Sequence, residues 1–229
     1  KEITEVVSNN FYEPYGIHLE SSEQSANRHL PIPSTHPDER IANILSSNQS
    51  IHCLNVTQKN DWEDSNEEEA LFVAELAKET LGKGLRSDQF AIITPYRRQV
   101  KAIRESVINA TGITDSSKLP LIDTVERLQG QDVDMIILST SITDPAYFTA
   151  QRDFILNPNR LNVMISRAKM KVVVIGKYLD INNLVPASTD SYINFCQYEP
   201  EDGCIMIEDV IDTIFDNGQY CEQMGQYLG

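Results

Sequence analysis

Several patterns that would assign a chain to a common class at once are absent from this sequence. The four cysteines, Cys53, Cys196, Cys204 and Cys221, include no C-x-x-C pair, which disfavours zinc and predicts thiols in a reducing compartment, the cytoplasm. No apolar run approaches the roughly 18 residues of a membrane span, and no basic-then-apolar leader opens the chain. We therefore expect neither a metal site nor a membrane partner.

Two glycine-rich nucleotide motifs are also absent. A phosphate loop reads G-x-x-x-x-G-K-[ST], but the pairs Gly82-Lys83 and Gly176-Lys177 have no glycine at the earlier position and no Ser or Thr after the lysine. The G-x-G-x-x-G phrase of Rossmann-type enzymes does not follow the first expected strand either. The chain thus lacks the element that would hold a triphosphate and Mg²⁺. If it acts on ATP, it can supply only half of the ATP site.

Charge is unevenly distributed along the chain. With 19 basic and 34 acidic residues the net charge is −15, which argues against a generic nucleic-acid binder. From Thr94 to Lys177, however, twelve basic residues outnumber eight acidic ones, whereas ten acids and no Lys or Arg follow Lys177. We expect residues 181–229 to form a solvated, acidic C-terminal appendage, with a partner-binding or self-masking tail as the alternative.

Apolar runs alternate with helical patterns between residues 51 and 176. Strands are expected at 51–56, 90–93, 121–122, 133–139 and 172–176, and helices over 70–82, 97–107 and 159–169. This alternation predicts an α/β fold in which helices cover both faces of a mostly parallel sheet. A hydrophobic content of 41% in 229 residues is enough for one such domain and an appendage.

The remaining segments are harder to interpret. Residues 1–10 predict a helix, whereas the prolines of residues 11–50 predict an irregular connection that has room for a short strand. Loops are expected over 109–120 and 144–154, and short helices are possible at 189–195 and 210–215. We divide the chain into an N-terminal helix and connection (1–50), a main domain (51–180) and the C-terminal extension (181–229). Because the first helix is already under way at Lys1, we expect a piece of a longer protein.

Two phrases, Thr124–Asp132 and Leu161–Lys169, each lead into a strand, where α/β proteins place nucleotide sites. Arg167 ends a helix beside a strand, and Arg160 lies seven residues earlier on the same stripe. A guanidinium fixed there can bind a phosphate through two hydrogen bonds; the alternative is an ordinary surface ion pair.

Further side chains beside the expected strands could contact ligands. In Gln129-Gly130-Gln131-Asp132, the glycine permits close backbone approach, the glutamines donate and accept, and the carboxylate can accept from a ribose hydroxyl; an ordinary loop is the alternative. Thr94 and Thr124 follow strands and could bind a nucleic-acid phosphate. Tyr96 could stack on a base or pack on the sheet, and Arg97, with Lys101 and Arg104, could follow a phosphate backbone or form a solvated helix face.

In this order, the motifs resemble the second RecA-like motor domain of superfamily 1 helicases, and most closely the group that holds the up-frameshift helicase and senataxin. Ile93–Gln99 resembles the phrase ITPYRxQ, Thr124–Asp134 resembles motif V (TVDxFQGxExD), and Leu161–Lys169 resembles motif VI (LNVAxSRAR). Asn10–Glu13 resembles the FYEG phrase that follows QYRMHP in this group. The resemblance covers roughly residues 2–178.

The resemblance implies a RecA-like three-layer domain that closes on a first RecA-like domain of the same chain, which would hold most of the ATP and Mg²⁺. Arg167 would then reach the γ-phosphate, and Asp132, where the family usually has Glu, would contact the nucleotide. Thr94, Pro95 and Thr124 would line a single-stranded nucleic acid. The prediction is the second motor domain of an ATP-dependent DNA or RNA helicase, inactive alone; the alternative is a non-motor nucleic-acid-binding or regulatory module.

Overall fold

The apolar runs form one parallel sheet. The computed structural model describes residues 1–55, 62–128, 130–155 and 157–177. The strands lie side by side in the order β1-β5-β4-β2-β3, and every neighbouring pair is parallel. Their bounds are β1 Ile51–Leu54, β2 Phe90–Ile93, β3 Leu121–Asp123, β4 Val133–Ser139 and β5 Ala168–Ile175. The predicted α/β class is therefore confirmed.

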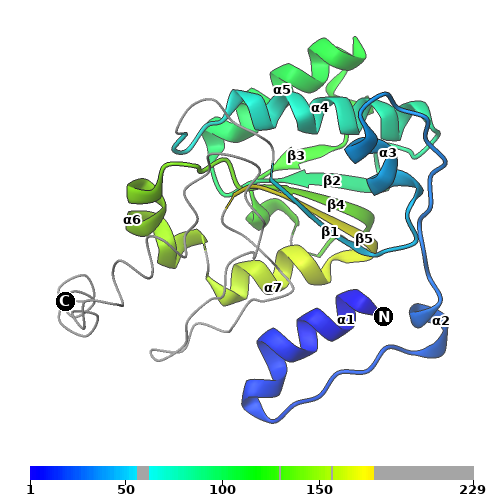
Figure 1. Ribbon diagram of the computed structural model, residues 1–229, viewed down its shortest axis with the longest axis vertical. Coiled ribbons are helices and arrows are strands. Elements are labelled where there is room, and N and C mark those ends of the chain that lie inside the picture. The colour runs from blue at the N-terminus through cyan, green and yellow to red at the C-terminus, as the bar shows by residue number, and fades with distance from the viewer. Residues whose placement is uncertain (56–61, 129, 156, 178–229) are drawn as a thin grey trace.

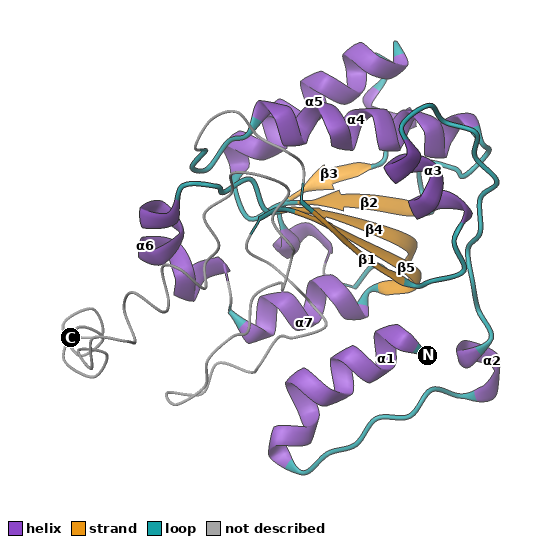
Figure 2. Ribbon diagram, viewed as in Figure 1, coloured by secondary structure: helices purple, strands orange, loops and turns teal. Residues whose placement is uncertain are grey.

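Helices cover both faces of this sheet (Figure 1 and Figure 2). One face carries α3 (Glu39–Ser46), α4 (Glu67–Gly82) and α5 (Arg97–Thr111), and the other carries α1 (Glu2–Val7) and α7 (Pro158–Ser166). Alternate strand residues point into two separate hydrophobic cores. This explains why the strand sequences are apolar throughout rather than alternating, and it gives the three layers of a RecA-like domain.

Local signals fix where the helices begin and end. The Asn66 side chain accepts a hydrogen bond from the Glu69 amide at the start of α4, whose first turn is acidic. Asn157 caps α7 in the same way, and Pro158 occupies its first position. At the end of α5, Gly112 adopts a φ of 71°, which a glycine reaches without strain.

The N-terminal connection is more helical than predicted. Residues 11–50 contain no strand; instead, η1 (Ser8–Tyr12) and η2 (Glu13–Tyr15) follow α1, and α2 (Glu23–Ala26) and α3 come next. The sequence does contain a helix pattern for α3. Asp38 is its N-cap and accepts from the Arg40 amide, and the apolar residues Ile41, Ile44 and Leu45 share one face. The prolines of this segment obscured that signal.

Four further expectations on elements and their boundaries are wrong. The loop expected over 144–154 is instead largely the helix α6 (Pro145–Ile155), and α5 continues to residue 111. The helix α7 ends at Ser166 rather than Lys169, and β5 begins at Ala168 rather than Val172. The early start of β5 was hidden by Lys171, a fully buried residue whose ammonium donates to the carbonyls of Ile44 (2.6 Å) and Ser47 (2.9 Å) at the end of α3.

Some expectations lie outside the described residues. These are the C-terminal extension (181–229), the short helices at 189–195 and 210–215, Cys196, Cys204 and Cys221. Within the described residues, no helix is long and apolar enough to cross a membrane. In that same part of the chain, no group of three His, Cys, Asp or Glu side chains could hold a metal ion.

A buried polar network lies under the end of β4. The Glu69 carboxylate, with no exposed surface, accepts from the backbone amide of Ser141 at 3.2 Å, while Asn66 Nδ2 donates to the Ser141 carbonyl at 3.0 Å. Gln99 of α5 belongs to the same network: its Oε1 accepts from the Asn66 amide at 2.7 Å, and its Nε2 donates to Ser139 Oγ at 3.0 Å. Burial raises the pKa of Glu69 to about 7, although the hydrogen bonds from Ser139 and Ser141 oppose that shift.

This pKa makes the free energy of unfolding depend on pH. Because the folded chain holds the Glu69 proton more tightly than the unfolded chain, stability should fall as pH rises from 4.5 to about 7, by on the order of 3 kcal/mol. Urea unfolding at about pH 5 and about pH 8 measures this difference. Glu69→Gln should flatten the profile, whereas Glu75→Gln, at an exposed position of the same helix, should leave it unchanged. A profile that Glu69→Gln does not alter would contradict this assignment.

Candidate functional site

The residues just before β4 and β5 meet at the amino edge of the sheet. Val133 and Ala168 are paired in register, so Asp132 and Arg167, one position earlier in each strand, are neighbours. The Arg167 carbonyl accepts from the Val133 amide at 3.1 Å, and Arg167 Nη1 donates to Asp132 Oδ1 at 3.0 Å. The two predicted phrases are thus joined by backbone and side chain.

The ion pair between Asp132 and Arg167 is accessible. The Asp132 side chain is 54% exposed and that of Arg167 34% exposed, so solvent screens the attraction. Arg167 Nε is buried and has no hydrogen-bond partner among the described residues. The ion pair is the alternative that the sequence left open for Arg167, and because exposed pairs are weak, an anion could take over this guanidinium at little cost.

The turn before Asp132 depends on glycine. Gly130 has a φ of 78°, in the left-handed region, and the Gln131 amide donates to the Leu128 carbonyl at 3.1 Å. Gly130 and Gln131 are exposed. Gln129 lies outside the described residues. The nucleotide-binding roles predicted for this phrase remain predictions.

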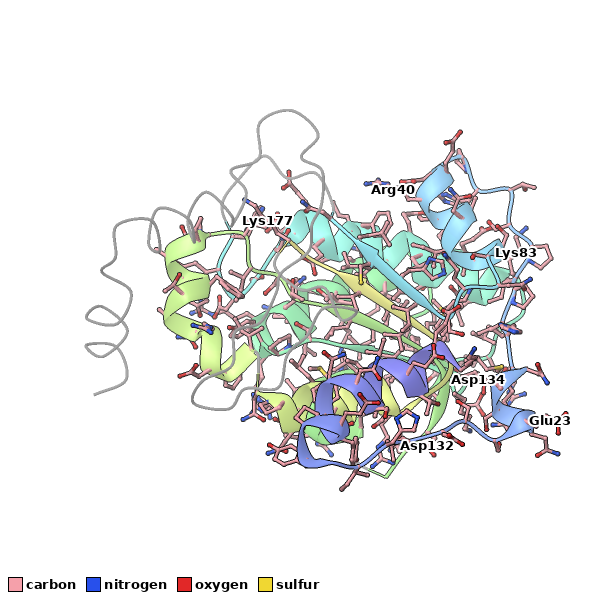
Figure 3. All side chains as sticks on the ribbon, turned by 60° about the horizontal axis from the view of Figure 1, so that its bottom comes forward. Glu23, Arg40, Lys83, Asp132, Asp134 and Lys177 are labelled. Carbon is pink, nitrogen blue, oxygen red and sulfur yellow. The ribbon has the colours of Figure 1, made fainter. Side chains whose placement is uncertain are left out.

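The residues just after β2 and β3 lie at the opposite, carboxyl edge. Thr94, Pro95 and Tyr96 follow β2, and Thr124 follows β3, with the Thr94 amide donating to the Asp123 carbonyl at 3.3 Å. Figure 3 shows the two ends of the sheet, with Asp132 and Asp134 at one and Lys177, which follows β5, at the other. The structure therefore separates the predicted nucleotide residues 130–132 and Arg167 from the predicted nucleic-acid residues.

The exposure of the predicted nucleic-acid residues differs. Thr94 has no exposed surface, and its hydroxyl has no hydrogen-bond partner among the described residues. Thr124 is 6% exposed, and its hydroxyl hydrogen-bonds with Glu126 in η4 (Val125–Leu128). Arg97 is exposed at the start of α5, while Pro95 and Tyr96 are partly buried. Only Arg97 presents a fully accessible polar group to a nucleic acid in this conformation.

Arg160 lies apart from Arg167, although the two share a helical stripe. Arg160 is in the first turn of α7 and Arg167 follows its end, so a rise of about 10 Å separates them along the axis. Arg160 Nη2 contacts Glu126 Oε1 at 2.8 Å, and its guanidinium stacks on the Phe154 ring at 4.1 Å. By position, Arg160 belongs with the carboxyl edge.

Glu126 links the charged groups of the carboxyl edge. Partial burial alone would raise the pKa of its carboxyl, but the Thr124 hydroxyl and the charges of Arg160 and Arg97 lower it below the usual value. Sequence reasoning missed Glu126 and Phe154. The charge of Glu126, two residues after Thr124, could have marked it as a candidate site residue. Phe154 could not be found in this way, because its segment was interpreted as a loop.

Comparison with known proteins adds an independent finding. The model of a protein family described as an AAA domain matches residues 1–179. Probable RNA helicase armi of Drosophila melanogaster is 32% identical over 126 residues, which cover 52% of this chain and 10% of that protein. Probable helicase MAGATAMA 3 of Arabidopsis thaliana is 38% identical over 90 residues (39% and 10%).

The name of a third relative refers to DNA replication. The DNA replication ATP-dependent helicase/nuclease DNA2 of Homo sapiens is 29% identical over 124 residues, which cover 53% of this chain and 11% of that protein. The chain therefore spans about a tenth of the length of these curated relatives. The shared part is a domain found in proteins whose names include both RNA and DNA helicases.

Gly130 offers a stability test of the turn at the amino edge. Gly130→Ala should lower the free energy of unfolding by about 1 kcal/mol, because alanine is strained at a φ of 78°. Gly82→Ala, within helix α4 and with nothing within 4 Å of an added Cβ, should be neutral or stabilising by about 0.5 kcal/mol. Urea unfolding measures both; equal effects would show that the left-handed turn is not required.

Proposed function

Since this chain belongs to the AAA domain family and is a superfamily 1 helicase-type domain, we propose that it is the second motor domain of an ATP-dependent helicase or translocase. The observation that carries the proposal is the separation of two groups of residues on opposite edges of one sheet. An arginine and a carboxylate lie at the amino edge, and an exposed arginine with strand-end hydroxyls lies at the carboxyl edge. Membership of the up-frameshift and senataxin group remains a prediction.

The amino edge is proposed to complete an ATP site on a first motor domain. Arg167 suits an arginine finger because its side chain is partly exposed and its only described ion pair is a weak, exposed one. A guanidinium brought to the γ-phosphate stabilises the charge on the transferred phosphoryl group. Gly130, Gln131 and Asp132 would contact the nucleotide, while most of the ATP and Mg²⁺ contacts belong to the first domain.

The carboxyl edge is proposed to guide a single-stranded nucleic acid. Arg97 supplies an exposed charge, and Pro95 and Tyr96 form the adjoining surface. The buried hydroxyls of Thr94 and Thr124 would need a local shift before they could contact the strand. Closure of the two motor domains is a motion that could supply this shift, which would couple hydrolysis to movement along the strand.

A second candidate is a non-motor module that binds nucleic acid and has no part in ATP turnover. The Asp132–Arg167 ion pair is consistent with this candidate, because in this conformation the arginine is paired within the domain rather than presented to a phosphate. The two candidates differ in one property: only the motor requires Arg167 for catalysis.

The isolated chain should not hydrolyse ATP. The sequence contains no phosphate loop, and an arginine finger contributes only when another domain presents the nucleotide. Release of inorganic phosphate by highly purified residues 1–229, with and without single-stranded nucleic acid, measures this. Sustained turnover that follows the protein through successive purification steps would contradict the proposal.

In the intact protein, Arg167→Ala should lower the turnover of ATP by about 10³-fold or more while ATP still binds. Arg167→Lys should restore little, because lysine keeps the charge but not the planar two-pronged donor. Nucleic-acid-stimulated ATPase assays and binding of a fluorescent ATP analogue separate turnover from binding. Near-normal turnover by both variants would favour the non-motor candidate.

A further inference from the structure

Three aromatic rings and a guanidinium contact one another in a row at the carboxyl edge, with the neighbouring rings tilted by 55° and 36°. The rings of Tyr147 and Tyr96 have centroids 6.3 Å apart, and those of Tyr96 and Phe154 are 5.7 Å apart. The Arg160 guanidinium carbon then lies 4.1 Å from the centre of the Phe154 ring. The row therefore starts at Tyr147 on α6, passes Tyr96 at the start of α5 and returns to Phe154 on α6. It ends in the planar guanidinium of Arg160 on α7.

The two tyrosine rings of this row are partly buried. Tyr96 and Tyr147 pack against the hydrophobic core on the α7 face of the sheet, and the Tyr96 hydroxyl oxygen is buried without a partner among the described residues. Burial raises the pKa of Tyr96 well above its usual value, so this hydroxyl stays neutral. Tyr96 is thus placed to support the row rather than to meet a base itself.

Arg160 is held in place on two sides. One face of its guanidinium lies on Phe154, and one edge contacts Glu126 at 2.8 Å. The backbone amide of Arg160 also donates to the Asn157 cap of α7 at 3.2 Å. The Arg160 side chain is still 32% exposed, so part of it is open to a ligand.

We propose that the outer face of Arg160, supported by Phe154 and held by Glu126, is a stacking platform for a nucleobase of a single-stranded nucleic acid. This inference rests on the proposed function and changes one residue assignment. The sequence placed Arg160 with the nucleotide, whereas its position at the carboxyl edge, beside Tyr96 and the Thr124–Glu126 turn, places it on the nucleic-acid track.

The chemistry of a held guanidinium favours stacking over a purely ionic contact. A guanidinium is planar, weakly hydrated and stacks readily on aromatic faces. Because Glu126 already compensates its charge, Arg160 should contribute little to counterion release, which is the source of the salt dependence of binding. Because the contacts with Phe154 and Glu126 already fix the side chain, binding a base would immobilise little more of it.

The test measures the affinity of the 229-residue chain for fluorescent single-stranded oligouridylate and oligothymidylate of about 12 nucleotides. Arg160→Lys keeps the charge but removes the plane, and Phe154→Leu keeps apolar volume but removes the ring. Each variant should weaken binding by roughly tenfold, the effect of losing one stacked base, while the slope of affinity against salt is unchanged. Arg97→Ala, in contrast, should reduce that slope by about one.

Two controls make the result specific. Arg86→Lys changes an arginine that is paired with Asp88 and lies just before β2, at the other edge of the sheet, so it should leave affinity unaltered. An abasic strand of equal length offers the same phosphates without bases, so Arg160→Lys should not weaken binding to it. Circular dichroism and thermal unfolding show that each variant is folded.

The possible failures are distinguishable. If the unchanged chain prefers base-containing strands to abasic ones but Arg160→Lys and Phe154→Leu bind both like the unchanged chain, the stacking inference is wrong and the proposed function stands. Equal affinity of the unchanged chain for both strands would likewise overturn only the stacking inference. If the unchanged chain binds neither strand at any salt concentration, the proposed nucleic-acid track itself is contradicted.

Discussion

The register between β4 and β5 is the constraint on which the rest of the structure depends. Val133 pairs with Ala168 at one end and Ser139 with Ile175 at the other, within a sheet that is buried on both faces. Between Val133 and Met135 this register shifts by one residue, so that Val133 pairs with Ala168 instead of Lys169. It brings Asp132 and Arg167 together at the amino edge.

The same constraint separates the two groups of residues for which we propose different ligands. The residues immediately before β4 and β5 lie at one end of the sheet, and those immediately after β2 and β3 lie at the other. Helix α7 spans the distance between them, with Arg160 at its start and Arg167 at its end. The motor function proposed above requires such a division, because a motor must bind ATP at one edge and move a strand at the other.

The sheet could be predicted from the sequence because continuous apolar, β-branched runs bounded by polar turns are typical of buried parallel strands. The helix α6 was missed because only Phe148 and Ile155 of its apolar residues are buried, so no clear apolar face marks it, and β5 was begun too late because Lys171 is a buried lysine that the pattern counts as polar. The ion pair of Arg167 was foreseen only as an alternative. The position of Arg160 could not be predicted, since a seven-residue spacing gives a shared stripe but not the contacts at each end of the helix.

The claim that the two edges serve two ligands is tested most directly by hydrogen–deuterium exchange of the 229-residue chain with and without a saturating single-stranded oligonucleotide. The account predicts slower exchange in peptides from the carboxyl edge, covering residues 94–101, 124–128 and 157–161. It predicts no change in peptides covering residues 130–134 and 165–169. Protection that appears at residues 130–134 and 165–169, and not at the carboxyl edge, would contradict it.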